Sequence, residues 1–451
     1  MIVKTVVRPE TEMKNSGIEY IGKIPNDWEV RKVGYLAAKI TDYVASGSFA
    51  TLAQNVQYLD EPDYARLIRT VDLSGSVNKQ PVYVSKEAYK FLSNSNLFGG
   101  ELILPNIGSV GCVYQYKKIY EHATLAPNSI LLDMKENNRF YFYWFSNPIV
   151  GESLKMLGNS TVQVKFNKSQ LRQYMLPRPP LSEQQAIADY LDETCSKIDE
   201  IIAEAKASID EYKELKQSVI FEAVTKGLDK NVEMKDSGVE GMGFIPAKWP
   251  VVRFMKVNYV RARLGWKGLK AEEYVDVGYP FLAAYHIVNG HLCWENLNCI
   301  TKERYDESPE IKLSIGDLVL VKDGAGIGKC ARIDDMPLGE ATVNSSLSVI
   351  TPNKLLDYRY EYYYFMSPLF QNIIARLKNG MGVPHLTQES MKDIYLPLPS
   401  KNEQQAIADY LDNKMIGLDS LIAEKESLIN DLEAYKKSLI YEVVTGKRKV
   451  V

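Results

Sequence analysis

The 451-residue sequence predicts an α+β protein that contains one unit twice, as an internal pseudo-twofold repeat. Each predicted unit is a mixed α/β block followed by a long helix, and the two helices are expected to pair as an antiparallel intramolecular coiled coil. Three observations lead to this fold class: the decapeptide EQQAIADYLD occurs at residues 183–192 and again at 403–412, a long amphipathic segment follows each copy, and similar segments precede the two blocks. Similarity at a fixed separation is the signature of a repeated unit.

The first element of each unit is one of the similar segments MKNSGIEYIGKIPNDWEV, from Met13, and MKDSGVEGMGFIPAKWPV, from Met234. These segments and the two decapeptides are each separated by about 220 residues, so the repeat fills the chain. We expect blocks at residues 1–180 and 228–399, helices at 181–227 and 400–447, and a short tail at 448–451.

The interiors of the two blocks share only short fragments. GGELIL resembles IGDLVL, and YWFSNP resembles YYFMSP. Stretches such as ELILPN and GDLVLVK predict short apolar strands that end in turns. Because the two repeat units are similar at their ends and differ in their interiors, we expect one scaffold that presents two different functional surfaces.

Each decapeptide begins a predicted helix of about 45 residues, because apolar side chains recur on one face at spacings of three, four and seven. Ser182 with Gln185, and Asn402 with Gln405, fit capping boxes at the helix starts. Gly227 follows the first helix as a stop signal, and Gly446 is its counterpart. The apolar stripe consists of Ile187, Leu191, Ile198, Ile202 and Ile209 in the first helix and Ile407, Leu411, Leu418, Ile422 and Ile429 in the second.

A helix of that length, roughly 65 Å, must bury its apolar stripe. The near-copy elsewhere in the chain is the obvious partner, and a pseudo-twofold repeat makes a self-matching interface, which for two helices means antiparallel pairing. Two alternatives remain at this stage: each helix could pack on its own block, or pair with another chain.

Composition narrows the class of protein. No apolar run is long enough to span a bilayer and no signal segment opens the chain, so a cytoplasmic location is expected. The cysteines, Cys112, Cys195, Cys293, Cys299 and Cys330, form no CxxC pair, which favours small buried thiols over a disulfide framework or a zinc site.

The net charge of −3 is unevenly distributed. Residues 181–227 carry −6 and residues 401–447 carry −3, which leaves +6 on the rest of the chain. A basic excess on the blocks permits nucleic-acid binding without proving it.

The glycine-rich stretch VLVKDGAGIGKC, residues 319–330, does not meet the requirements of a phosphate-binding loop. Asp323 stands where the first glycine is needed, and Cys330 replaces the serine or threonine. We expect a tight strand-to-strand turn that approaches a ligand or a neighbouring backbone. The sequence also contains no HExxH helix, Ser-His-Asp signature or NPPY-type tetrapeptide, which favours a binding module over an enzyme.

The order of block, LPxP-type connector, EQQAIADYL and long helix, used twice, resembles the specificity subunit of Type I restriction-modification systems. The likeness covers essentially the whole chain and rests on YMLPRPPLSEQQAIADYLD, IYLPLPSKNEQQAIADYLD and the two SG-IP-W segments. The resemblance implies a non-catalytic reader of double-stranded DNA, with two target-recognition domains for the halves of a bipartite site and paired helices that set the gap between them. Because the two blocks differ, the target is expected to be asymmetric.

The resemblance also implies partners. Two modification subunits that methylate adenine are expected to dock on the frame, together with ATP-dependent restriction subunits. S-adenosylmethionine, ATP and Mg are then expected on those subunits, with no cofactor or metal on this chain. Docking is assigned, alongside capping, to Glu183, Gln184, Gln185, Tyr190, Glu403, Gln404, Gln405 and Tyr410.

Candidate DNA-contacting residues are polar or basic side chains in the block loops, chosen by their position in the resembling pattern. Guanidinium and amide groups suit base edges, whereas lysines suit phosphates. Each could equally be an ordinary exposed loop residue. The candidates are Arg66, Arg69, Thr70, Asp72, Lys79, Gln80, Asn106, Ser109, Ser160, Thr161, Gln163 and Lys165 in the first unit, and Lys267, Tyr285, His286, Lys322, Lys329, Asn379 and His385 in the second.

The alternative function is a repeated scaffold with two protein-binding blocks and no DNA contact. Such a protein should lack the steep salt dependence of DNA affinity that phosphate contacts produce. A chain that methylates or cuts DNA by itself is disfavoured because the corresponding motifs are missing.

Overall fold

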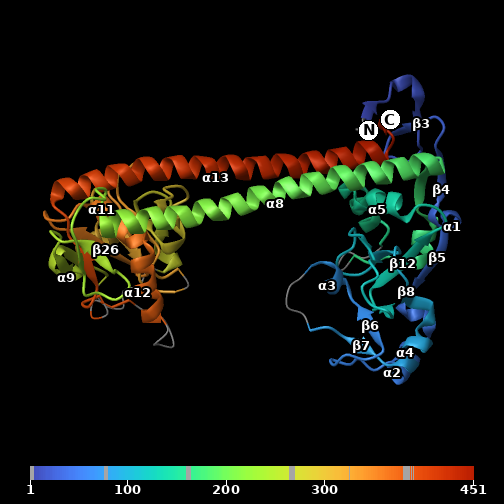
Figure 1. The fold of residues 1–451 in the computed structure, drawn as a ribbon, viewed down its shortest axis with the longest axis horizontal. Coiled ribbons are helices and arrows are strands. Elements are labelled where there is room, and N and C mark those ends of the chain that lie inside the picture. The colour runs from blue at the N-terminus through green and yellow to red at the C-terminus, as the bar shows by residue number, and fades with distance from the viewer. Residues whose placement is uncertain are drawn as a thin grey trace. The chain divides into compact units, whose positions relative to one another are not determined.

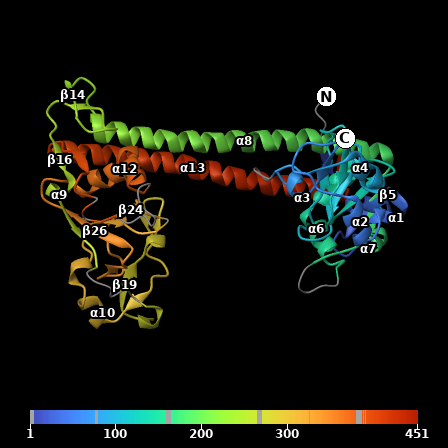
Figure 2. The ribbon, with the colours of Figure 1, turned by 90° about the horizontal axis from the view of Figure 1, so that it is seen from below.

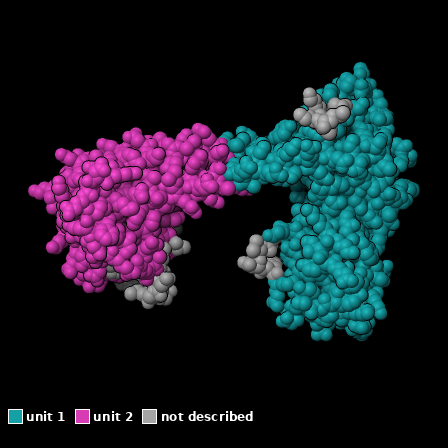
Figure 3. All heavy atoms as spheres, viewed as in Figure 1, with its two compact units in different colours: residues 1–205, 427–451 teal, residues 206–426 magenta. Residues whose placement is uncertain are grey.

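The computed structural model describes residues 5–75, 80–158, 164–263, 270–324, 326–378, 386, 387, 389 and 391–450. The chain divides into two compact units, one formed by residues 1–205 and 427–451 and the other by residues 206–426 (Figure 3). Each unit therefore contains one block, the first part of the helix that follows it, and the last part of the other long helix. We call them unit 1 and unit 2.

Unit 1 is built on two four-stranded sheets (Figure 1). The first is antiparallel, in the order β10 (Tyr114–Gln115), β9 (Leu102–Pro105), β12 (Ser129–Met134), β5 (Ala37–Asp42). The second has the order β7 (Tyr83–Val84), β6 (Ala65–Ile68), β11 (Ala123–Leu125), β8 (Asn96–Leu97), and its β6 and β11 are parallel. Two smaller pairs join β4 (Glu29–Lys32) to β13 (Met175–Arg178) and β2 (Met13–Asn15) to β3 (Lys23–Pro25).

Short helices connect and cover these strands in unit 1. They are α1 (Val33–Leu36), α2 (Phe49–Asn55), α3 (Thr70–Leu73), α4 (Lys86–Phe91), α5 (Asn138–Ser146), α6 (Pro148–Lys155), α7 (Lys168–Gln173) and the 3-10 turns Glu10–Glu12, Tyr43–Ser46 and Ser93–Ser95. Helix α5 is capped by the side chain of Asn137 and buries Phe140, Tyr141, Trp144 and Phe145, so it forms part of the core.

Unit 2 repeats this plan (Figure 2). Its antiparallel sheet has the order β24 (Cys330–Arg332), β23 (Leu318–Val321), β26 (Leu347–Pro352), β17 (Asn258–Arg261), and its second sheet has the order β18 (Tyr274–Val275), β22 (Cys299–Ile300), β19 (Tyr279–Leu282), β25 (Thr342–Val343), with β19 and β25 parallel. The small pairs are β16 (Val251–Arg253) with β27 (Tyr395–Pro397), β14 (Met234–Asp236) with β15 (Phe244–Pro246), and β20 (Ile287–Val288) with β21 (His291–Leu292).

The helices of unit 2 are α9 (Phe254–Val257), α10 (Lys302–Asp306), α11 (Tyr358–Met366), α12 (Pro368–Lys378) and the 3-10 turns Ala271–Glu273, Ala284–His286 and Pro309–Ile311. Helix α11 occupies the place of α5 and buries five aromatic rings from Tyr360 to Phe365. The predicted repeat is thus confirmed by the antiparallel sheet, the central parallel pair and the core helix. The second sheets differ in their fourth strand, which is β8 beside β11 in unit 1 and β18 beside β22 in unit 2.

The two long helices are α8 (Leu181–Lys226) and α13 (Lys401–Val444), and they pack together. In unit 1, Lys436 donates to both carboxylate oxygens of Asp199 at 2.6 Å. In unit 2, Lys216 bonds to Asp419, which is the same pair with the two copies exchanged. The helices therefore run antiparallel within each unit, as predicted.

The predicted apolar stripe is the buried face of the long helices. All of its residues are buried except Ile422, which is half-buried. In unit 2, a single core cluster contains Ile407, Leu411 and Leu418 of α13, Ile220 of α8 and the aromatic side chains of α11. The start of each helix thus packs on its own block, and the pairing of the helices continues beyond it.

The predicted capping boxes are wrong. Helix α8 already begins at Leu181, and the carbonyl of Pro180 accepts from the amides of Glu183 and Gln184. Helix α13 begins at Lys401, and its capping box is formed by Ser400 and Glu403, two residues before the predicted one. The stop signals are confirmed, since Gly227 and Gly446 adopt left-handed φ angles of 74° and 73°.

Unit 1 also holds both ends of the chain, which Figure 1 marks. Strand β1 (Thr5–Val7) pairs antiparallel with β28 (Arg448–Val450), and Arg8 bonds to Glu183 at the start of α8. The prediction of buried cysteines holds for Cys195 and Cys330, but Cys112 is exposed.

Candidate nucleic-acid interface

In unit 1, three turns meet where strands of the two sheets begin or end. The amide of Ala126 donates to the carbonyl of Ile68 at 2.9 Å, which joins the turn before β12 to the end of β6. The hydroxyls of Thr70 and Ser129 lie 3.2 Å apart. The amide of Asn106, directly after β9, donates to the carbonyl of Asn128 at 3.1 Å.

A fourth segment joins these turns through Asn106. Its side-chain amide donates to the carbonyl of Phe166 at 2.9 Å, and its own carbonyl accepts from the amide of Phe166 at 3.2 Å. Ile107 also forms a bridge with Lys165. Candidates from three separate stretches, Thr70, Asn106 and Lys165, are therefore brought together, and with Asn128 and Ser129 they form what we call the strand-end cluster of unit 1.

Unit 2 builds the same cluster with different side chains. The amide of Asn344 donates to the carbonyl of Leu282 at 2.8 Å, and the amide of Lys322 donates to the carbonyl of Ser346 at 2.9 Å. Leu386 then donates to the carbonyl of Lys322 at 2.9 Å, as Phe166 does to Asn106. Lys322 thus occupies the backbone position of Asn106, and the strand-end cluster of unit 2 comprises Lys322, Asn344, Ser346 and Leu386.

The cluster residues Asn128, Ser129, Asn344 and Ser346 were not among the sequence candidates. Asn128 has a positive φ of 70°, a conformation that asparagine tolerates better than most residues. The signal that could have found these residues is the fragment PNS at the start of β12 and the corresponding NSS before β26. Both are polar turns that lead into a buried strand.

Arg66, Arg69 and Asp72 form one ionic group beside the strand-end cluster of unit 1. Both guanidinium groups bond to Asp72, Arg66 at 3.0 Å and Arg69 at 2.9 Å. Burial alone would raise the pKa of the Asp72 carboxyl, but hydrogen bonds from Arg69 and the two positive charges outweigh it and hold the pKa below its usual range.

Arg66 and Arg69 differ in what else they can contact. The Arg66 side chain is only 5% exposed and also donates to the carbonyls of Leu67 and Val82, so the structure gives it an internal role rather than an open base-reading edge. The Arg69 side chain is 28% exposed and donates to the carbonyl of Gln80. Arg69 is therefore the arginine of this group that a ligand can reach.

His286 is also turned inward. It is 4% exposed, its Nδ1 accepts from the amide of Ala283 at 2.9 Å, and burial lowers its pKa, so the ring is neutral at pH 7. The neighbouring Tyr285 is 65% exposed, with its ring centroid 4.1 Å from that of His286. The accessible candidate of this pair is Tyr285.

Among the other candidates, Gln80, Ser109, Lys165 and Lys329 are exposed. Lys322 is half-buried and bonds to Asp323 at 2.8 Å. Seven candidates lie outside the described residues: Lys79, Ser160, Thr161, Gln163, Lys267, Asn379 and His385.

The glycine-rich stretch of unit 2 is a hairpin turn between β23 and β24, as expected. Gly324 and Gly328 have φ angles of 82° and 90°. A Cβ atom on Gly328 would lie 2.9 Å from Ile374, so the turn passes too close to α12 for any side chain at this position.

The predicted docking residues of the decapeptides are largely used inside their own units. Gln184 and Gln404, predicted to matter for docking as well as capping, are fully buried, so their side chains offer no exposed surface to a partner. The carboxylates of Glu183 and Glu403 accept from the indole N–H groups of Trp28 and Trp249. Gln185, Gln405 and Tyr410 are exposed and Tyr190 is half-exposed, so these four remain open to a partner.

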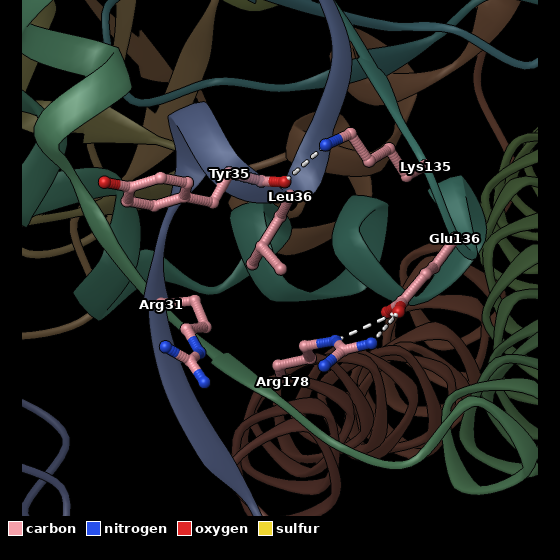
Figure 4. Close-up of a pocket in the computed structure, with 6 residues that line it drawn as sticks. All are labelled: Arg31, Tyr35, Leu36, Lys135, Glu136 and Arg178. Atoms are coloured by element: carbon pink, nitrogen blue, oxygen red, sulfur yellow. Dashed lines mark hydrogen bonds and ion pairs between the residues drawn. The ribbon is translucent and has the colours of Figure 1, made fainter.

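A cavity of about 370 Å³ lies at the opposite end of β12 from the strand-end cluster (Figure 4). Arg178 donates to Glu136 at 2.6 Å, and the ammonium group of Lys135 donates to the carbonyl of Tyr35 at 2.9 Å. Glu136 also accepts from Gln184 of the decapeptide at 2.6 Å. Strand β12 thus connects the strand-end cluster at one end to the start of α8 at the other.

No cluster of three or more potential metal ligands occurs among the described residues. In the same part of the chain, none of the helices combines the length and the apolar character needed to cross a membrane.

The fold and the two clusters define a duplicated recognition protein, in which two blocks of one design present different polar edges. The chain belongs to the family of the Type I restriction modification DNA specificity domain, whose sequence model matches residues 25–211 and 265–433. It therefore carries two DNA specificity domains, one in each repeat.

Individual relatives agree with this family. The specificity subunit of the Type I restriction enzyme MjaVIII of Methanocaldococcus jannaschii is 24% identical over 440 residues, which cover 95% of this chain and 94% of the relative. The EcoKI specificity subunit of Escherichia coli is 26% identical over 209 residues, 46% of this chain and 44% of the relative. These relatives are specificity subunits, and the prediction of a recognition subunit rather than an enzyme is confirmed.

Two solved structures share the fold. One, described in a study of complex assembly and conformational transition of the type I R-M system, has a TM-score of 0.69 at 13% identity and covers 94% of this chain and 99% of its own. The HsdS subunit from Thermoanaerobacter tengcongensis has a TM-score of 0.52 at 14% identity, with 94% and 98% covered.

Proposed function

We propose that this chain reads an asymmetric bipartite target on double-stranded DNA, one half-site with each block, and that α8 and α13 act as the coiled-coil spacer between the halves. The observation that carries the proposal is the strand-end cluster, which both units build with the same backbone bonds but from different side chains. One frame with two sets of polar groups suits two different half-sites, because base edges are distinguished by the donors and acceptors that face them.

The reachable side chains divide into two kinds. Arg69, Thr70 and Asn106 in unit 1 and Tyr285 and Asn344 in unit 2 offer hydrogen-bonding groups suited to base edges. The exposed ammonium groups of Lys165 and Lys329 are suited to phosphates, which position the protein without specifying sequence.

The same proposal assigns partner docking to the outer faces of the long helices. Ile201 and Leu421 occupy equivalent positions and are 45% and 40% exposed, and Leu215 and Tyr435, again equivalent, are 43% and 51% exposed. Apolar side chains repeated outside the buried seam of a helix pair are available to further helices. We assign these positions to the modification subunits, together with the exposed Gln405 and Tyr410.

In this proposal the restriction subunits join the modification subunits, and S-adenosylmethionine, ATP and Mg are bound by those partners. The double-stranded DNA target places the complex in the cytoplasm. Nothing in the proposal requires a cofactor on this chain.

The test is co-expression with the cognate modification subunit in a host without adenine methylation, followed by mapping of modified adenines by direct sequencing. A split, asymmetric motif with one constant gap is expected. A continuous or palindromic motif contradicts the bipartite reading. No modification by an assembled complex supplied with methyl donor favours a protein-binding scaffold.

A further inference from the structure

Three contacts between the decapeptide EQQAIADYLD and its own block recur in both units, and the first is made by its glutamate. The indole N–H of Trp28 donates to Glu183 at 2.8 Å, and Trp249 donates to Glu403 at 3.3 Å. Trp28 and Trp249 are buried, so each bond connects a glutamate at the start of a long helix to the core of its block.

The second point is the buried glutamine that follows. The side-chain oxygen of Gln404 accepts from the amide of Asp357, directly before α11, at 2.7 Å, and its Nε2 donates to the carbonyls of Leu355 and Pro399. Gln184 repeats the pattern with the amide of Asn137 and the carbonyl of Pro179. The glutamine therefore links the long helix to the core helix of the block.

The third point is the last residue of the decapeptide. In unit 1, Tyr143 donates to Asp192 at 2.6 Å and Arg139 donates to it at 2.5 Å. In unit 2, Tyr363 and Arg332 each donate to Asp412 at 2.7 Å. Burial would lower the pKa of Arg139, but the hydrogen bonds and charge interactions with Asp192 and Tyr143 together outweigh it, so the net shift is upward and the guanidinium keeps its charge.

These contacts constrain the helix more than one contact could. The aspartate follows the glutamate by nine positions, which is about 13 Å along a helix. A single anchor leaves a helix free to tilt and to rotate about its axis, whereas anchors at both ends of this segment fix both angles. Strand β12 or β26 then connects the anchored end of the block to its strand-end cluster.

We propose that the decapeptide is an intramolecular joint whose aspartates, Asp192 and Asp412, position each strand-end cluster relative to its helix and so set which gap length between half-sites is accepted. This inference rests on the proposed bipartite function. It also explains why both copies are identical, since each must hold the same frame at the same angle while the recognised bases differ.

The two joints are not equally strong. Asp412 holds Arg332 and Tyr363 and lies 3.3 Å from Arg359, whereas Asp192 holds one arginine and one tyrosine. Gln115, the counterpart of Arg332 on the neighbouring strand, accepts from Arg139 instead of reaching the aspartate. Replacement of Asp412 should therefore loosen gap selection more than replacement of Asp192.

The experiment measures binding of the assembled complex to duplexes in which the two mapped half-sites are separated by the natural gap, by one base pair less, and by one or two more. The variants are Asp192→Asn and Asp412→Asn. Glu193→Gln serves as the matched control, because Glu193 is exposed beside Asp192 and, within the described part of the chain, forms its ion pair along the helix with Lys197 rather than with the block. Tyr143→Phe and Tyr363→Phe remove one neutral donor each and test the same joints without removing a charge.

We expect the ratio of affinities for natural and altered gaps to fall about tenfold in Asp412→Asn, less in Asp192→Asn, and not in Glu193→Gln. The tyrosine variants should show smaller falls in the same order. A variant that weakens binding to every duplex by the same factor, or that keeps the wild-type ratio, would contradict the proposed role of the joint in gap selection. If the aspartate variants do not fold, the tyrosine variants decide in the same way. A wild-type complex that accepts all gaps equally would instead contradict the proposed bipartite function.

Discussion

Trp28 donates its indole N–H to the carboxylate of Glu183 across 2.8 Å, although 155 residues separate them in the chain. Trp249 and Glu403 repeat the contact in unit 2. The tryptophan belongs to the IPxxW segment that opens each unit and the glutamate opens each decapeptide, so the two most similar parts of the repeat are the two sides of one contact.

Replacement of Trp28 by phenylalanine keeps the buried ring but leaves Glu183 with Arg8 as its remaining side-chain partner. We expect the free energy of unfolding to fall by about 1 kcal/mol, the usual net contribution of a hydrogen bond. Trp249→Phe should cost less, because its bond to Glu403 is longer at 3.3 Å. Urea unfolding of both variants measures this order, and equal losses would contradict it.

The architecture could be predicted because similar segments recur in the sequence at a separation of about 220 residues. Periodic apolar residues such as Ile198 and Leu418 specify a helix face, and exact duplication specifies that the partner has the same face. The roles inside the decapeptide were less accessible. Gln184 resembles an exposed helix-start residue, and only the tertiary fold shows that the amide before α5 needs it as an acceptor.

For the candidate DNA-contacting residues, too, the sequence indicates position in the fold better than it indicates the direction of each side chain. The loops selected from the sequence are brought together by the fold, since Thr70, Asn106 and Lys165 meet at one edge. The sequence could not show which side chains point outward. Arg66 and Arg69 are three residues apart and chemically identical. The Arg66 guanidinium is buried and bonds to backbone carbonyls and to Asp72, whereas the Arg69 side chain is partly exposed.

Arg69→Ala should lower affinity for the half-site read by unit 1 by about tenfold to a hundredfold and relax base preference there, because a guanidinium contact to a base edge typically provides 1–3 kcal/mol of discrimination. Preference at the other half-site should stay unchanged. Anisotropy titrations with duplexes altered in one half-site at a time measure both. Arg31→Ala is the control, since Arg31 is exposed at the opposite end of the same block. Unchanged target choice and affinity in Arg69→Ala would exclude Arg69 as a reader.

Lys329→Ala should behave differently from Arg69→Ala. If its exposed ammonium group contacts a phosphate, affinity falls by a similar factor for every DNA sequence, and the slope of log affinity against log salt becomes shallower by about 1. Lys165→Ala should show the same effect in unit 1. Titrations at several salt concentrations test both residues, and an unchanged slope would remove them from the phosphate contacts.

Ile198→Asp and Leu418→Asp place a charge in the buried seam between the long helices, where both residues are 5% exposed. Each should lower the free energy of unfolding by at least about 3 kcal/mol, as loss of a buried aliphatic side chain does. Ile201→Asp and Leu421→Asp are matched controls three residues further on, at exposed positions. The controls should fold normally but lose affinity for the modification subunit. If these control variants bind the modification subunit normally, Ile201 and Leu421 do not belong to the docking surface.

The pH dependence of stability in unit 2 should depend on Glu361. Burial raises the pKa of its carboxyl to about 8, against an opposing hydrogen bond from Asn258, whereas an unfolded chain titrates near 4.5. The folded pKa lies above the unfolded one, so the folded state favours the neutral acid. The associated stability is fully present below pH 4.5 and is lost as pH rises through 8.

Between those values the free energy of unfolding should fall by about 1.4 kcal/mol per pH unit on account of this group. Glu361→Gln keeps the shape and the acceptor for Asn258 but cannot ionise, and Tyr141 at the equivalent position of unit 1 carries no carboxyl. The variant should therefore lose this slope and become more stable than the wild type near pH 8. Urea unfolding at pH 5.5, 6.5 and 7.5 compares the two proteins, and parallel pH profiles would show that the buried carboxyl does not control stability.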